Sequence, residues 1–175
     1  MNSLLLDADV IIDVHRLGFW QQFIEKNGIH IASIILRLEA LFYFDTKHRK
    51  RPINLRHELS EHKLVKLHAI ISEIKDLWKR FDLEFAPQLD SGEVECLAIL
   101  KKREDLKFCT FDGAAITALG LLNLANRGIS LERVLRECGL QKNLPTKYSD
   151  ERFKRYIKQG QEMRITGQGL KGQAK

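Results

Sequence analysis

The chain has 175 residues, of which 44% are hydrophobic and 30% are charged. This length suits one domain with a buried core, and the mixed charge and ordinary apolar content exclude a disordered chain. The net charge is +6, but residues 1–140 contain as many acidic as basic residues, so the whole surplus lies in residues 141–175. We therefore predict a neutral domain over residues 1–140 and a basic extension over residues 141–175, made of a helix and a flexible tail.

The first part of the chain predicts two short strands, each followed by a helical segment. Apolar residues 3–6 and 29–32 form the strands. Ser33 caps the second helix, which we expect to run to about Asp45. A basic stretch over residues 47–52 follows it.

The rest of the chain continues this alternation. Ser60 begins a predicted long amphipathic helix that reaches Trp78, with a third strand over residues 83–85. The elements predicted after it are a helix from Asp90 or Ser91 to Lys102, a strand over 107–111, helices over 114–126 and 130–138, and a basic helix from Ser149. Alternating strands and helices are typical of a mainly parallel sheet covered on both faces, so we predict a three-layer α/β/α fold with four to five strands.

The cysteines and the apolar segments indicate a cytoplasmic protein. Cys96, Cys109 and Cys138 are an odd number without metal-ligand spacing, which is typical of small core residues in a reducing compartment. Charged residues interrupt the first apolar run at once, so we expect no secretion signal. The longest uncharged apolar stretch, residues 113–126, is too short to cross a bilayer and predicts a buried helix.

Two aspartates directly follow predicted strands: Asp7 comes after the first and Asp112 after the fourth. Ligands of open parallel sheets bind at the carboxyl ends of the strands. An aspartate at this position can equally cap the next helix, which is worth about 1 kcal/mol. Taken alone, each of the two residues favours the capping interpretation.

Two glutamates lie on apolar helix faces. Glu39 shares its face with Ile35 and Phe42, where an ionised carboxylate costs several kcal/mol unless a cation or hydrogen bonds compensate it. Either its carboxylate reaches solvent or it is a buried functional group. Glu93 lies in the first turn of its helix and, with Asp90, also fits a structural capping box.

A third glutamate of this region, Glu95, is expected to point into solvent. The other four acidic residues, Asp7, Glu39, Glu93 and Asp112, belong at one edge of the sheet without a neutralising Lys or Arg. Four facing carboxylates raise one another's pKa values, and a divalent cation resolves this conflict. Ligation by oxygen atoms suits Mg²⁺ or Mn²⁺, which in phosphoryl chemistry activates a water and stabilises the transition state.

Four segments resemble the motifs of the PIN-domain family, in the family's order. They are Leu5-Leu6-Asp7-Ala8-Asp9-Val10-Ile11-Ile12, residues 33–41 with Glu39, Gly92-Glu93-Val94-Glu95-Cys96-Leu97-Ala98-Ile99-Leu100, and Phe108-Cys109-Thr110-Phe111-Asp112. The resemblance covers about residues 3–138, and the order and spacing of the four motifs carry it.

The resemblance to PIN domains, and to their VapC-like members, implies a ribonuclease that hydrolyses RNA phosphodiester bonds with Mg²⁺ or Mn²⁺. By carry-over, Asp7, Glu39, Glu93 and Asp112 are the catalytic residues and hold the metal. Many small relatives are dimeric toxins that an antitoxin protein holds inactive. The resemblance therefore implies RNA, an antitoxin and a second copy of the chain as partners, although the C-terminal extension is longer than a minimal toxin needs.

Three further residues belong to the predicted site. Asp9 stands where the family often has Asn, so it can add a ligand, and Asp90 can replace Glu93 as the third acid. Either aspartate can orient the attacking water. Thr110 belongs to the fourth motif, which ends in T-x-D.

Two basic segments can hold RNA through phosphate contacts. One is the stretch after the second helix, and the other is the C-terminal helix, where aromatic and basic residues alternate. The predicted RNA-binding residues are Lys47, Arg49, Lys50, Arg51, Lys154 and Arg155. A solvated loop explains the first segment equally well. For the C-terminal helix, Phe153 and Tyr156 between the basic residues favour nucleic acid, although these aromatic side chains can equally dock the helix on the domain or on a second subunit.

Two rival functions stay open. Asp7-Ala8-Asp9-Val10 imitates the D-x-D nucleophile motif of HAD-type phosphatases, and a phosphoaspartate on Asp7 would identify that class. Alternatively, the chain is a non-catalytic nucleic-acid-binding or assembly module. Such a module would have no Mn²⁺ site that depends on Glu39.

Overall fold

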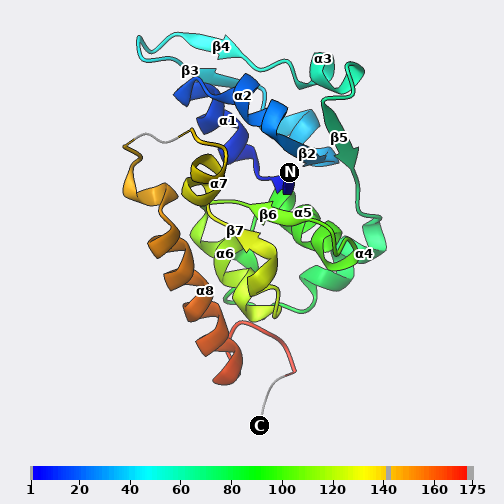
Figure 1. Ribbon diagram of the computed structural model, residues 1–175. Helices are drawn as coiled ribbons and strands as arrows, with labels where there is room; N and C mark the ends of the chain where they lie inside the picture. Colours follow the sequence, from blue (N-terminus) through cyan, green and yellow to red (C-terminus); the bar gives the residue numbers. More distant parts are fainter. Residues whose placement is uncertain (1, 141–142, 173–175) are drawn as a thin grey trace.

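The computed structural model describes residues 2–140 and 143–172, and it has five parallel strands with helices on both sides (Figure 1). The strands are β1 (Asn2–Leu6), β2 (Asn27–Ala32), β5 (Leu64–Leu67), β6 (Lys107–Cys109) and β7 (Gly128–Ile129), and a separate antiparallel hairpin consists of β3 (Phe42–Phe44) and β4 (Lys50–Pro52). The helices are α1 (Ala8–Leu17), α2 (Trp20–Lys26), α3 (Leu55–Ser60), α4 (Ile71–Trp78), α5 (Ser91–Lys102), α6 (Gly113–Leu121), α7 (Leu131–Glu137) and α8 (Asp150–Ile165). Short helical turns are η1 (Ile35–Glu39), η2 (Ala86–Gln88), η3 (Ala125–Arg127) and η4 (Thr146–Tyr148).

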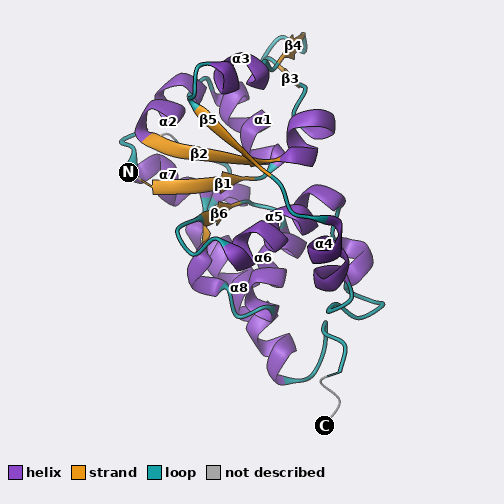
Figure 2. Ribbon diagram, turned by 90° about the vertical axis from the view of Figure 1, so that its right-hand side faces the viewer, coloured by secondary structure: helices purple, strands orange, loops and turns teal. Residues whose placement is uncertain are grey.

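The main sheet has the strand order β5-β2-β1-β6-β7. Leu5 of the central strand pairs with His30 on one side and Phe108 on the other. Helices α1 and α2 cover one face, while α4, α5 and α6 cover the other (Figure 2). The three-layer α/β/α prediction is therefore confirmed, and the carboxyl ends of β1 and β6 meet at one edge.

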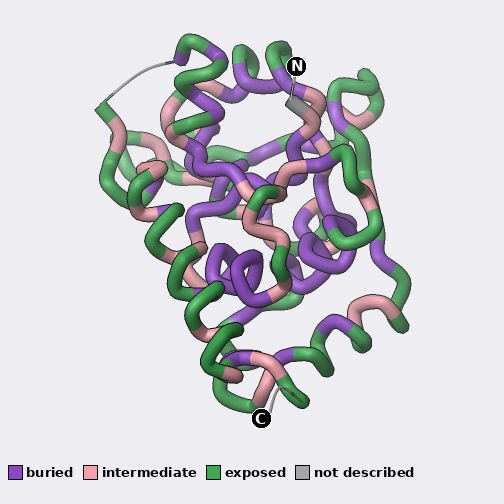
Figure 3. Tube along the Cα trace, turned by 60° about the horizontal axis from the view of Figure 1, so that its bottom comes forward, coloured by how far each residue is buried: buried purple, intermediate pink, exposed green. Residues whose placement is uncertain are grey.

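Burial explains the run of three leucines in the central strand β1. Leu4, Leu5 and Leu6 are fully buried, as expected for a strand with helices on both faces. Figure 3 shows the buried residues in the interior of the molecule and the exposed residues along its outer segments. The predicted buried helix is α6, and the three cysteines are buried free thiols, as expected. Among the described residues, no helix combines the length and apolar character needed to cross a membrane.

The long helix predicted from Ser60 to Trp78 is wrong. The structure instead has α3, the strand β5 and α4 in this region. Leu64 and Leu67 have helical spacing with Ile71, but they lie at the two ends of β5, which pairs with β2. His62 turns the chain between α3 and β5 with a φ of 59°.

Two shorter predictions are also wrong. The helix expected to reach Asp45 is the single π-helical turn η1, after which the chain forms the β3–β4 hairpin. Residues 83–85 form no strand, because Asp82 Oδ1 accepts hydrogen bonds from the backbone N–H groups of Glu84 and Phe85 and holds a turn.

The C-terminal extension packs against the domain through α8, whose predicted start at Ser149 is confirmed. Its backbone contacts that of α6 so closely that a Cβ on Gly160 would lie 2.1 Å from the carbonyl oxygen of Thr117. The segment expected to be a flexible tail follows α8 as far as residue 172, and in it Gly169 donates a backbone hydrogen bond of 2.7 Å to Asp82. Residues 141–142 and 173–175 of the extension lie outside the described residues.

Candidate functional site

Asp7 links the end of β1 to the beginning of α1. One of its carboxylate oxygens accepts a hydrogen bond from the backbone N–H of Ala8 at 2.7 Å, and the other accepts from the Thr110 hydroxyl at 2.6 Å. The side chain is 5% exposed, and this burial raises the pKa of Asp7 to about 7. The charges of Asp9 and Asp90 contribute to this rise in pKa, whereas the hydrogen bonds from Thr110 and Ala8 oppose it.

Glu93 lies in the first turn of α5, which begins after Asp90. The two residues form the predicted capping box: the Asp90 N–H donates to Glu93 at 2.9 Å, and the Glu93 N–H donates to Asp90 at 2.8 Å. Glu93 is 5% exposed, and burial raises its pKa to about 9. The nearby carboxylates of Asp112 and Asp7 contribute to this shift.

Asp112 lies beyond the carboxyl end of β6 and caps α6. Its carboxylate accepts hydrogen bonds from the backbone N–H groups of Ala114 at 2.7 Å and Ala115 at 3.0 Å. Its own N–H donates to the hydroxyl oxygen of Thr110, the same hydroxyl that donates to Asp7. Thr110 is fully buried and therefore fixes the two aspartates relative to each other.

Glu39 ends η1 and lies against the first turn of α5. A Cβ on Gly92 would be 2.3 Å from one carboxylate oxygen of Glu39, so glycine is what lets the carboxylate reach this position. Partial burial raises the pKa of Glu39, and the charges of Asp90, Glu95 and Asp9 add to this effect. Within the described residues, no hydrogen bond compensates the Glu39 carboxylate.

The structure therefore brings Asp7, Glu39, Glu93 and Asp112 to one edge of the sheet. The charges of Asp7 and Asp112 act on Glu93, and the charge of Asp90 acts on Asp7, Glu39 and Glu93. In the part of the chain that the structure describes, no three acidic, His or Cys side chains converge closely enough to hold a metal ion as they stand. Three of the four predicted ligands instead hydrogen-bond to backbone N–H groups. The hydrogen bonds of Asp7, Glu93 and Asp112 thus agree with the capping interpretation of these residues.

The donor set and its electrostatics nevertheless fit a divalent cation. The groups are carboxylates, which Mg²⁺ and Mn²⁺ prefer, and burial plus mutual repulsion disfavours their ionised forms. No described group donates a hydrogen bond to the half-buried Glu39 carboxylate, so its charge is left to water or to a cation. Asp7, Glu39, Glu93 and Asp112 would hold the ion, and the exposed Asp9 and Asp90 lie close enough to contribute charge.

Glu95 contradicts its prediction, because it is 3% exposed rather than solvated. It accepts hydrogen bonds from the Ser33 hydroxyl and the Ile34 N–H, both at 2.9 Å, and from the Ala69 N–H at 3.3 Å. These contacts join the segments that follow β2 and β5 to α5. Glu95 is therefore a structural carboxylate that supports the turn carrying Glu39.

Two cations beside the acidic edge were not predicted. Lys147 lies close enough to lower the pKa of Asp9, which partial desolvation and the charge of Asp13 raise. Arg152 donates a hydrogen bond of 2.6 Å to the carbonyl of Phe111, next to Asp112. Both belong to the basic extension, so its net charge was the available signal, but nothing in the sequence separates these two residues from its other cations.

The Lys147 side chain also ties the extension to α1. Its Nζ lies 2.6 Å from the carboxylate of Asp13, which also accepts a hydrogen bond from the Tyr148 hydroxyl at 2.7 Å. Arg16 pairs with the same carboxylate at 2.6 Å. These contacts around the buried Asp13 carboxylate fix the position of Lys147 relative to the acidic edge.

The predicted RNA-binding residues are exposed and lie on two separate elements. In the hairpin, Asp45 binds the guanidinium groups of Arg49 at 2.9 Å and Arg51 at 3.0 Å, while Lys50 lies over the ring of Phe42. The loop residue Lys47 donates its backbone N–H to Asp45. On α8, Lys154 pairs with Asp150 at 2.7 Å, and Arg155 lies near the ring of Tyr156.

Comparisons of this chain with protein-family models, with curated proteins and with solved structures found no match.

Proposed function

We propose that the protein is a Mg²⁺- or Mn²⁺-dependent endoribonuclease whose active site is the acidic edge formed by Asp7, Glu39, Glu93 and Asp112. The observation that carries the proposal is the meeting of buried or half-buried carboxylates from four separate segments at the carboxyl ends of β1 and β6. Helix capping explains the hydrogen bonds of these carboxylates, but it does not explain why four carboxylates lie together. Three helix N-termini do not require a fourth carboxylate at Glu39.

The bound cation would supply Lewis acidity and charge compensation for hydrolysis of a phosphodiester. The side chains of the protein position the reacting groups and attract the substrate. The Thr110 hydroxyl orients the Asp7 carboxylate and binds the backbone N–H of Asp112, whose own carboxylate is held by the N–H groups of Ala114 and Ala115. Asp9 is exposed at the same edge and is the side chain best placed to orient an attacking water. Lys147 and Arg152 attract the substrate phosphate toward an otherwise repulsive edge.

The contacts of Asp7 count against the HAD-type alternative. Both carboxylate oxygens of Asp7 accept hydrogen bonds, and the side chain is buried. A nucleophilic aspartate needs one oxygen free to attack phosphorus, so Asp7 suits a positioning or ligating role better. The toxin–antitoxin setting and a homodimer belong to the proposal only as contexts in which the same ribonuclease would work.

The decisive experiment measures cleavage of a single-stranded RNA with Mn²⁺ by the wild type and by Asp7→Asn and Asp112→Asn. We expect each variant to lose at least a hundredfold in rate. Asp105→Asn is the matched control, since Asp105 pairs with Arg103 on the surface before β6, and it should retain full activity. Full Mn²⁺-dependent activity in Asp7→Asn and Asp112→Asn would refute the assignment.

A binding experiment separates this enzyme from a non-catalytic RNA-binding module. Calorimetry of the wild type should detect a Mn²⁺ site, and Glu39→Gln should weaken or abolish it. A module that merely binds RNA predicts no such site. Wild-type protein that binds no Mn²⁺ would therefore favour the module.

A further inference from the structure

A cavity of about 400 Å³ opens directly beside Asp112, between α6, α8 and the segment that contains η2. It is lined by Phe85, Gln88, Asp112, Gly113, Ala114, Thr117, Arg152, Tyr156, Gln159 and Met163. Its size lies in the range of small-molecule sites. Because Asp112 belongs to the proposed active edge, whatever occupies this cavity lies next to the reacting group.

The wall formed by α8 combines an aromatic ring with a fixed cation. The guanidinium carbon of Arg152 lies 4.7 Å from the centre of the Tyr156 ring, and Arg152 is held by its hydrogen bond to the Phe111 carbonyl. The Tyr156 ring itself lies against Gly113, where a Cβ would approach its Cε1 to 2.8 Å. Planar aromatic and guanidinium groups are the surfaces on which unpaired nucleobases stack.

The remaining lining offers hydrogen bonds and apolar contact. Gln88 and Gln159 each present an amide, which can donate to and accept from the edge of a base. Gln88 donates to the carbonyl of Glu84, so its amide is oriented, whereas the Gln159 amide makes no hydrogen bond within the described part of the chain. Phe85 and Met163 supply apolar surface.

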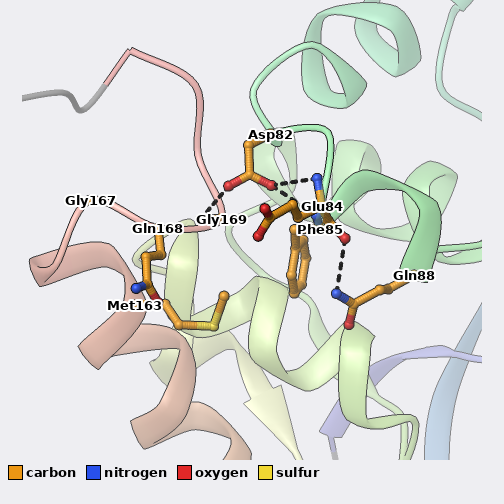
Figure 4. A pocket seen from close by; sticks show the side chains of 8 residues that line it. All are labelled: Asp82, Glu84, Phe85, Gln88, Met163, Gly167, Gln168 and Gly169. Atoms are coloured by element: carbon orange, nitrogen blue, oxygen red, sulfur yellow. Dashed lines mark hydrogen bonds between the residues drawn. The ribbon is translucent and has the colours of Figure 1, made fainter.

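A second hollow, whose lining residues are drawn in Figure 4, adjoins this cavity. The two hollows share Phe85, Gln88 and Met163, and Asp82 and Glu84 line the part of the second hollow that the cavity does not share. Two carboxylates in that part repel phosphate. The phosphate of a bound nucleotide therefore belongs at Arg152, near Asp112, with its base directed toward Phe85 and Met163.

We propose that this cavity binds the base of one unpaired nucleotide, with the Tyr156 ring as its stacking surface and Arg152 as the partner of the adjoining phosphate. This inference rests on the proposed function and specifies its substrate class. A cavity of this size admits a base that is free to leave the helix stack, so the substrate is single-stranded RNA or an unpaired loop. The C-terminal helix then contributes to substrate recognition through Arg152, Tyr156 and Gln159.

The test measures binding, not cleavage, in EDTA and at fixed salt concentration. The probes are fluorescein-labelled single-stranded octamers of uridylate and of adenylate and an abasic ribose-phosphate octamer. We expect Tyr156→Leu to weaken binding of the base-containing probes by at least fivefold and to leave the abasic probe unchanged. Trp78→Leu, which removes an exposed aromatic ring on α4, is the matched control and should change neither.

A second variant covers the case in which Tyr156→Leu loses its fold. Gln159→Ala removes an exposed amide, and it should weaken base-containing probes by two- to tenfold without changing the abasic probe. Equal losses for base-containing and abasic probes, no loss in either variant, or competition by duplex RNA as strong as by single strands would overturn the proposal. If base-dependent binding is intact but Mn²⁺-dependent cleavage is absent, the ribonuclease proposal is refuted and the base-binding role of the cavity stands.

Discussion

Replacing Asp7 with asparagine should stabilise the metal-free protein much more at pH 8 than at pH 5. The pKa of Asp7 is about 7 in the folded protein against an ordinary value of 3.8, so the folded state binds the proton more tightly than the unfolded state does. Stability contributed by this group is therefore complete below pH 3.8 and falls as the pH rises through about 7. This is the opposite of the usual behaviour of a salt-bridged aspartate.

The magnitude follows from the size of the shift. A difference of about 3 pH units corresponds to about 4 kcal/mol of destabilisation once Asp7 is fully ionised. An asparagine side chain at this position would avoid this cost, but its amide has only one accepting oxygen. It can therefore keep a hydrogen bond from only one of the two donors, the Ala8 N–H or the Thr110 hydroxyl, which removes about 1 kcal/mol of the gain. We expect Asp7→Asn to raise the free energy of unfolding by about 3 kcal/mol at pH 8 and by less than about 1 kcal/mol at pH 5.

Urea denaturation in EDTA, followed by circular dichroism at both pH values, measures this difference. Asp105→Asn controls for the loss of a surface aspartate and should shift stability by less than about 0.5 kcal/mol. Adding Mn²⁺ should stabilise the wild type and leave Asp7→Asn unchanged, since a ligand of the folded state stabilises it by mass action. A gain for Asp7→Asn that is equal at pH 5 and pH 8, or larger at pH 5, would show that the buried carboxylate is not the source of strain.

Three other substitutions test separate features of the structure. Glu95→Ala should lower the free energy of unfolding by about 3 kcal/mol or more in urea denaturation, because it leaves the donors of Ser33, Ile34 and Ala69 without their acceptor; a loss below about 1 kcal/mol would contradict that role. Gly160→Ala should cost about 3 kcal/mol in the same assay, since its methyl group would meet the backbone of α6, and an unchanged stability would mean that the helices do not touch there. Gly92→Ala should displace the Glu39 carboxylate and weaken Mn²⁺ binding about tenfold in calorimetry while the helix α5 remains folded; unchanged affinity would remove Glu39 from the metal site.

The sequence was sufficient where a local rule and the tertiary environment agree. The starts of α5 at Asp90, α7 at Ser130 and α8 at Ser149 follow from side chains that cap the next helix, and each side chain makes the expected hydrogen bond. The central strand was equally clear, because three consecutive buried leucines have no amphipathic alternative. Both capping and continuous burial can be recognised from residues that are neighbours in the sequence.

The errors arise where apolar spacing has two interpretations. Leu64, Leu67 and Ile71 recur at helical intervals, yet Leu64 and Leu67 belong to an edge strand and Ile71 begins a helix with its side chain 72% exposed. The burial of Glu95 could not be predicted either, because its hydrogen-bond donors lie 26 to 62 residues away along the chain. Distant partners decide whether a carboxylate on a helix is solvated.

The same limit applies to the candidate site. The four carboxylates were predicted as residues, but their hydrogen bonds to helix N-termini and the role of Thr110 as a link between Asp7 and Asp112 depend on the folded edge. For α8, the sequence predicted only that its basic residues contribute positive charge near the site. Its Tyr156 and Arg152 gain a specific position because Gly113 leaves room for the ring.

The close contact between α6 and α8 also bears on how the chain folds as it is synthesised. Helix α6 is buried almost all round, and residues 115–121 have no solvent-facing stripe. It leaves the ribosome before residues 150–165, so its outer side stays uncovered until α8 follows and Gly160 docks against Gly120. The nascent domain therefore exposes an apolar helix for the time needed to add about forty residues, and this interval is when a chaperone would recognise it.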